Sequence, residues 1–218
     1  ARNLAYLIIS GNKLEGTISD SLGNLSHLRT LQVSDNQLSG SIPSTIGKLD
    51  VLETVYFYNN LFSGTLPESV FTLPRLSILA LYNNRFTGTL SPLIGQAQRL
   101  KNFQLYQNQF YGSIPAEIGQ ISTLRYFYAH GNAFSGTIPD SIGNLGVLEQ
   151  LYLSNNQLEG TIPASINNLS KLTVLHAGTN RFSGTLPDIS NLTDLSYLYL
   201  GYNGLEGAFP DISNLLNL

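Results

Sequence analysis

The stretch "LRTLQVSDNQLSGSIPSTIGKL", residues 28–49, decides the fold because its pattern recurs along the whole chain. Successive units start 24 residues apart, as from Leu28 to Leu52, and 23 apart where "LPDISNL" (186–192) and "FPDISNL" (209–215) each lack one residue. Self-similarity at a fixed period of this size indicates a repeat architecture, so we expect a single solenoid over residues 1–218. Its nine units begin at Leu4, Leu28, Leu52, Leu76, Leu100, Leu124, Leu148, Leu172 and Leu195.

Each unit predicts a short strand, a turn punctuated by Gly and Pro, and a short apolar segment. One unit cannot bury its leucines alone, so the units must stack and share one continuous core. The ninth position of every unit is an asparagine, which we expect to hydrogen-bond neighbouring backbone as a ladder. A glycine at the thirteenth position permits a backbone conformation that other residues resist. The asparagines are Asn12, Asn36, Asn60, Asn84, Asn108, Asn132, Asn156, Asn180 and Asn203.

These units resemble the leucine-rich repeat, and their "GxIP" segment resembles its plant-type subclass, found in receptor kinase ectodomains and receptor-like proteins. The resemblance covers the whole chain but says little about function, because the repeat is a scaffold. It implies an α/β repeat fold, a right-handed superhelical arc of about nine 23–24-residue repeats. It further implies a parallel sheet on the concave face, short 3₁₀ or irregular turns on the convex face, and a second short strand at "GTIP".

Composition argues against several functional classes. Charged residues make up 11% of the chain, the net charge is −3 and no basic stripe exists, so nucleic acid is not an expected partner. No apolar run approaches the roughly 18 residues of a membrane span, so no membrane contact is expected within this stretch. Without cysteine, and with three histidines, the chain offers no Ser/His/Asp set, paired carboxylates, phosphate loop or metal cluster. We therefore predict no enzyme activity, no catalytic residue, no metal and no cofactor.

The tyrosines concentrate at particular positions of the unit. The first, fourth and sixth positions should point into the core, and the third, fifth, seventh and eighth should face solvent on the concave sheet. Of the 12 tyrosines, all but Tyr111 occupy these four solvent-facing positions, and Asp35 is the one charged residue there. A neutral aromatic face suits an extended ligand. The predicted ligand-binding residues are Tyr56, Tyr58, Tyr82, Tyr106, Tyr126, Tyr128, His130, Tyr152, His176, Tyr197, Tyr199 and Tyr202.

The seventh position is the most ordered of the four. Tyr58, Tyr82, Tyr106 and His130 hold it in consecutive units and should form a ladder of rings. The alternative reading is sheet stabilisation, because tyrosine favours strands and cross-strand aromatic pairs contribute about 0.2–1 kcal/mol each. Phenylalanine shows the opposite distribution, since all except Phe71 fall at expected core or turn-core positions.

Two further patterns lie away from the predicted aromatic face. Sequons for N-glycosylation occur at Asn24, Asn168 and Asn191, each in the convex part of its unit. A Ser/Thr ladder follows the invariant glycines and ends at Ala208. Such a ladder could match an ice lattice, but the structural reading, that these are ordinary strand residues of the repeat, is favoured. Its members are Thr17, Ser41, Thr65, Thr89, Ser113, Thr137, Thr161 and Thr185.

The leading functional hypothesis is an extracellular, receptor-ectodomain-like recognition module, secreted or membrane-anchored. Its partner would be an extended peptide, glycan or protein of neutral character, since Arg29, Lys101 and Arg125 lie only at the margin of the predicted face. One alternative is a secreted, glycosylated structural or adhesion protein that self-associates end to end, because neither end of the sequence shows a polar cap. Another is an inhibitor of a cell-wall enzyme.

Overall fold

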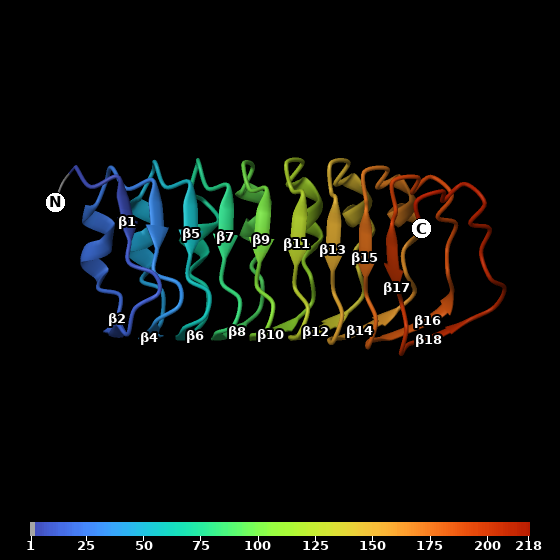
Figure 1. The fold of residues 1–218 in the computed structure, drawn as a ribbon, viewed down its shortest axis with the longest axis horizontal. Coiled ribbons are helices and arrows are strands. Elements are labelled where there is room, and N and C mark those ends of the chain that lie inside the picture. The colour runs from blue at the N-terminus through green and yellow to red at the C-terminus, as the bar shows by residue number, and fades with distance from the viewer. Residues whose placement is uncertain (1–2) are drawn as a thin grey trace.

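The computed structural model describes residues 3–218 and confirms the leucine-rich repeat solenoid of nine units. Figure 1 shows an elongated molecule in which the units stand side by side, from β1 at one end of the stack to β17 and β18 near the other. Each unit gives one strand to a nine-stranded parallel sheet in which neighbouring units are neighbouring strands. These strands are β1 (Tyr6–Ile8), β3 (Thr30–Gln32), β5 (Thr54–Tyr56), β7 (Ile78–Ala80), β9 (Asn102–Gln104), β11 (Tyr126–Tyr128), β13 (Gln150–Tyr152), β15 (Val174–His176) and β17 (Tyr197–Tyr199).

A second nine-stranded parallel sheet runs along one long edge of the molecule. Its strands are β2 (Glu15–Thr17), β4 (Gln37–Gly40), β6 (Leu61–Gly64), β8 (Arg85–Gly88), β10 (Gln109–Gly112), β12 (Ala133–Gly136), β14 (Gln157–Gly160), β16 (Arg181–Thr185) and β18 (Gly204–Glu206). These strands lie slightly earlier in the unit than the predicted "GTIP" segment, because most of them end at its glycine. That glycine has a positive φ, +77° at Gly40, and the proline that follows has no N–H to offer a ladder.

Short 3₁₀ helices cover the core on the side opposite the first sheet in seven units (Figure 1). They are η1 (Asp20–Asn24), η2 (Ser44–Lys48), η3 (Glu68–Val70), η4 (Pro92–Gln96), η5 (Ala116–Gln120), η6 (Asp140–Asn144) and η7 (Ala164–Asn168). The last two units lack one residue and form turns here instead. Their aspartates close these turns: the carboxylate of Asp188 accepts from the Ser190 amide at 2.9 Å, and that of Asp211 from the Ser213 amide at 2.9 Å.

The core is a continuous column of leucine, isoleucine and phenylalanine between the first sheet and the helices. In-register pairing of β9 with β11 puts Phe103 beside Phe127, whose rings stack at 5.8 Å. The expectation that Phe71 lies outside the core was wrong. Helix η3 ends at Val70, and Phe71 is buried with its ring edge-on to Phe103 at 6.1 Å. The exposed phenylalanine is instead Phe209.

The repeated asparagines form the expected ladder, and Asn108 shows its geometry. Its side-chain Nδ2 donates to the carbonyls of Leu81, Leu105 and Tyr106 at 3.0, 3.1 and 3.3 Å. Its Oδ1 accepts from the amide of Phe86 at 3.0 Å. One side chain thus bonds backbone groups of its own unit and of the preceding one.

Candidate ligand-binding face

The predicted ladder of rings is present on the open side of the first sheet. The ring centroids of Tyr58 and Tyr82 lie 4.5 Å apart, those of Tyr82 and Tyr106 lie 4.3 Å apart, and those of Tyr106 and His130 lie 4.4 Å apart. The interplanar angles are 3°, 8° and 10°, so the four rings are nearly parallel. Parallel strands in register repeat every ~4.8 Å, which brings equal positions of successive units to stacking distance.

Further rings extend this stack in both directions. Tyr56 packs edge-on against Tyr58 at 6.0 Å, and Tyr152 contacts His130 at 5.8 Å. His176 then joins Tyr152 to the two tyrosines of β17. We call this connected set the aromatic face; it comprises Tyr56, Tyr58, Tyr82, Tyr106, Tyr126, Tyr128, His130, Tyr152, His176, Tyr197 and Tyr199.

Tyr202 does not join the aromatic face, although it is among the predicted ligand-binding residues. It is 81% exposed and stacks on no aromatic ring among residues 3–218. Its φ of +59° belongs to the eighth position, where the chain turns away from the strand. Asn59 and Asn83 turn in the same way at the eighth position of their units, so this position projects beyond the sheet surface.

The seventh position is less open than expected. Ser34 and Ser154 occupy it in their units and are buried, at 0% and 3% exposure. The side chain here lies at the end of the strand, just before the turn, and neighbouring units cover its base. Tyrosine and histidine at this position are half-buried. Their stacking leaves a firm surface that loses little conformational freedom on binding.

A shallow hollow opens in the middle of the aromatic face. Tyr106, Tyr128, His130 and Tyr152 line it, and its volume is about 240 Å³. A row of eighth-position side chains runs alongside the stack. The Asn59 side-chain amide donates to the carboxylate of Asp35 at 2.7 Å, and the Asn83 side-chain amide donates to Asn59 Oδ1 at 2.7 Å. The aromatic face thus combines apolar rings with a parallel row of amides.

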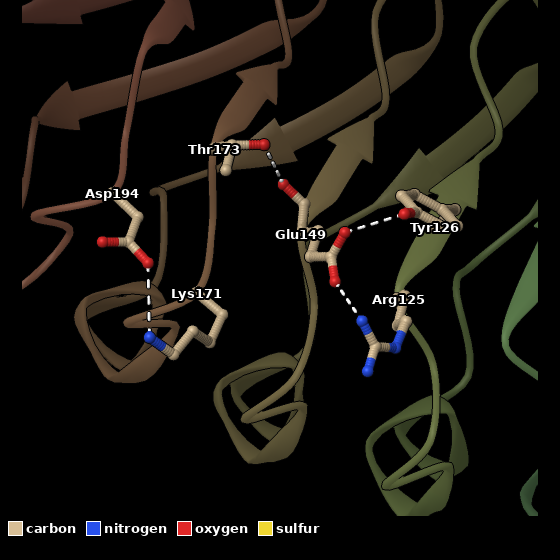
Figure 2. A network of polar contacts seen from close by, with 6 residues as sticks. All are labelled: Arg125, Tyr126, Glu149, Lys171, Thr173 and Asp194. Atoms are coloured by element: carbon tan, nitrogen blue, oxygen red, sulfur yellow. Dashed lines mark hydrogen bonds and ion pairs between the residues drawn. The ribbon is translucent and has the colours of Figure 1, made fainter. Parts of the chain in front are cut away.

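Two residues that the sequence did not single out hold tyrosines of the aromatic face in place. The Tyr126 hydroxyl donates to Glu149 Oε2 at 2.7 Å, and the Tyr128 hydroxyl donates to Gln150 Oε1 (Figure 2 shows the first). Both partners lie in the next unit, at its second and third positions. Searching the next repeat for acceptors at these positions would have found them.

Burial keeps the aromatic face uncharged. It raises the pKa of Tyr128 to about 12 and also raises the pKa of Tyr82 and Tyr106. It lowers the pKa of His130 to about 4, with the charge of His176 as a smaller cause, and lowers that of His176. The two histidine rings are therefore neutral near pH 7, because desolvation penalises the protonated form of each.

The protein should lose stability as the pH falls from about 6.5 toward about 4, and His130→Phe should remove part of that loss. In this window the unfolded chain binds a proton that folded His130 resists, so acid favours unfolding. The ring is half-buried, so after allowance for solvent screening its contribution is about 1–2 kcal/mol. Urea unfolding at pH 7 and pH 4.5 measures it. His27→Phe, on an exposed surface away from the stack, is the control, and equal pH dependence in both variants would contradict the expectation.

The three sequon asparagines lie on the opposite side of the solenoid from the aromatic face. Asn24 and Asn168 end helices η1 and η7, Asn191 lies in the equivalent turn of the shortened unit, and all three are exposed. Each is thus sterically open to a glycan, and N-glycosylation stays a prediction. The Ser/Thr ladder is also exposed, but it has a packing role, because the methyl of Thr17 lies over Gly40 and that of Thr89 over Gly112. This supports the structural reading of the ladder.

Among residues 3–218 no group of three or more His, Asp or Glu side chains is placed to hold a metal ion. None of the described helices is long and apolar enough to cross a lipid bilayer.

The family model described as "Leucine-rich repeat region" matches residues 4–130, and that described as "Leucine Rich Repeat" matches residues 123–145 and 147–169. No curated protein matches the chain significantly. Among solved structures, the Arabidopsis receptor kinase HAESA, in complex with the peptide hormone IDA and the co-receptor SERK1, is 37% identical over 99% of this chain, with a TM-score of 0.94. The plant peptide hormone receptor RGFR1, in complex with RGF2, is 28% identical over 100% of this chain, with a TM-score of 0.90.

A plant ice-binding protein is also similar, with 25% identity, a TM-score of 0.76, and coverage of 97% of this chain and 79% of its own. The chain spans 36% of the HAESA chain and 43% of the RGFR1 chain, so it corresponds to less than half of either receptor chain. The repeat pattern, the two parallel sheets and a family model that matches more than half of the residues agree: the chain belongs to the leucine-rich repeat family.

Proposed function

We propose that the chain is a non-enzymatic, extracellular recognition module that binds an extended, uncharged ligand along the aromatic face. The observation that carries this proposal is the nearly parallel stack of Tyr58, Tyr82, Tyr106 and His130, continued by rings on both sides. Stacked, half-buried rings form a rigid apolar track with polar tips. Ligands that lie across several strands gain contact area on such a track at little entropic cost.

The charge distribution favours an uncharged partner on this track. Asp35 is the one charged residue at the solvent-facing positions, and its carboxylate already accepts from Asn59. Burial lowers the pKa of His130 to about 4, so this ring also carries no charge near pH 7. A charged group placed directly on the rings would lose its hydration without gaining a counter-charge.

A peptide is the first ligand class to test. The amide row of Asn59 and Asn83 runs beside the stack, as a peptide backbone or a sugar chain would require for repeated hydrogen bonds. The HAESA structure contains the peptide hormone IDA, and RGFR1 is a peptide hormone receptor in complex with RGF2. These similarities favour a peptide ligand over a glycan or a folded protein. The similarity of both receptors to the chain also supports the extracellular assignment.

The first experiment is a combined peptide and glycan array probed with the wild-type protein and the triple variant Tyr82→Ala/Tyr106→Ala/Tyr128→Ala. Wild type should bind a discrete set of uncharged extended ligands, and the triple variant should bind at least about tenfold more weakly, because it removes the centre of the contact surface. Tyr111→Ala is the matched control, since Tyr111 is exposed but lies on β10 of the second sheet.

Equal binding by the triple variant and wild type would remove the aromatic face as the working surface. If no ligand on the array is bound, the alternative of a structural or adhesion protein is favoured. Light scattering at rising protein concentration would then reveal end-to-end assembly. Capture of a folded protein, with no peptide or glycan bound, would favour the enzyme-inhibitor alternative. Circular dichroism of each variant establishes that the fold is retained.

A further inference from the structure

Charged side chains line the edge of the first sheet where its strands begin, and most of them are paired. Arg29 Nη1 lies 2.6 Å from Glu53 Oε1, and Arg125 Nη1 lies 2.5 Å from Glu149 Oε1. Lys171 pairs with Asp194 at 3.4 Å, and Figure 2 shows these last two pairs on neighbouring units. In each case the partners stand at equivalent positions of adjacent units, which parallel in-register strands bring side by side.

This pairing stops in the middle of the edge. Lys101 stands at the second position of its unit, where its neighbours on either side are Ser77 and Arg125. Arg75 and Arg99 each precede the first leucine of a unit and neighbour each other. Within residues 3–218 none of Arg75, Arg99 and Lys101 has a carboxylate within ion-pair distance. Three cations are therefore left without counter-charges in a protein whose net charge is −3.

The three cations surround a hollow rather than a flat surface. Its volume is about 340 Å³, and Ser77, Thr123 and Glu53 complete its lining. The Thr123 hydroxyl is already used, since it donates to the Leu100 carbonyl at 2.8 Å. The hydroxyl of Ser77 makes no hydrogen bond to the described residues, so it is a free donor among the cations. Glu53, the one acid of the lining, is held by Arg29 at 2.6 Å.

We propose that this hollow, the strand-start pocket, binds an oxyanion: a carboxylate, sulfate or phosphate group carried by a ligand. Two guanidinium groups and one ammonium group around a neutral hydroxyl donor suit the several acceptor oxygens of such a group, and arginine in particular binds planar or tetrahedral oxyanions through paired N–H donors. The pocket lies where β9 and β11 begin, at the margin of the aromatic face, and its anion need not belong to the uncharged ligand of that face. The proposal goes beyond the uncharged-ligand function and does not depend on it.

The test uses small anions as probes, one at a time: sodium sulfate, sodium phosphate and sodium acetate, titrated at constant ionic strength against sodium chloride. Backbone amide shifts of residues 75–77 and 99–102 in ¹H–¹⁵N NMR spectra should change and saturate. The triple variant Arg75→Gln/Arg99→Gln/Lys101→Gln should weaken binding at least about tenfold, because each removed donor carries charge. Arg85→Gln is the matched control, an exposed arginine on β8 of the second sheet.

A second variant shows whether weaker anion binding by the triple variant is caused only by misfolding. Glu53→Gln removes the one acid of the strand-start pocket and should tighten binding several-fold, a gain that a damaged fold cannot produce. Stronger binding of sulfate and phosphate than of acetate would assign the pocket to tetrahedral anions, and the reverse order to carboxylates. Unsaturated shifts spread over the whole surface, or an equal loss in Arg85→Gln, would overturn the proposal. The triple tyrosine variant should retain anion binding, so failure of either proposal is seen separately.

Discussion

Asn108→Ala should lower the free energy of unfolding by about 2–3 kcal/mol, because the change removes four hydrogen bonds and leaves the amide of Phe86 without a partner. The carbonyls of Leu81 and Leu105 each keep one donor, the side-chain amide of Asn84 and of Asn132. Alanine keeps the backbone and removes the amide, and water has little access to replace it. Urea unfolding followed by circular dichroism measures the loss.

Two companion variants separate hydrogen bonding from the loss of side-chain volume. Asn108→Asp keeps the shape and the acceptor that receives the Phe86 amide, but it sets an oxygen against three carbonyl oxygens, so it should cost at least as much as alanine. Asn102→Ala should cost under about 1 kcal/mol, since Asn102 lies on the open side of β9 and bonds only Gln104. If Asn108→Asp left the free energy of unfolding unchanged, the hydrogen bonds of the asparagine ladder would not be a source of stability.

The repeat period alone predicted the parts of the fold and of the aromatic face that depend on register. Stacked units must place equal positions one strand apart, so four consecutive rings at the seventh position had to meet, and Tyr58, Tyr82, Tyr106 and His130 do. The same logic gave the asparagine ladder. These features follow from the geometry of parallel strands and need no knowledge of how any one side chain is packed.

Features that depend on local backbone direction were not predictable in this way. Tyr202 projects away because a positive φ turns the chain there, and burial of Ser34 shows that the seventh position lies below the sheet surface. Phe71 is buried in the core, where its helix η3 stops at Val70, two residues earlier than the helices of neighbouring units. The strand-start pocket depends on which charges lack partners, and charge pairs across units become visible only when equivalent positions are set side by side.

Phe127→Ala should lower the free energy of unfolding by about 3–5 kcal/mol, whereas Tyr128→Ala, one residue later, should cost about 1 kcal/mol. Phe127 is fully buried, stacks on Phe103 at 5.8 Å and leaves a cavity when truncated. Tyr128 lies on the other side of the same strand, half-buried, with its ring edge-on to Tyr152 at 5.0 Å and its hydroxyl bonded to Gln150. Urea unfolding of both variants under identical conditions gives the comparison.

This pair of adjacent residues decides between the two readings of the tyrosines. If Tyr128→Ala costs as much as Phe127→Ala, the aromatic face is part of what holds the sheet together, and its tyrosines need no ligand to explain them. If the costs differ as expected, the stability of β11 resides on its inner side. The rings on its outer side are then free to be used for binding, because losing one costs the protein little of its fold.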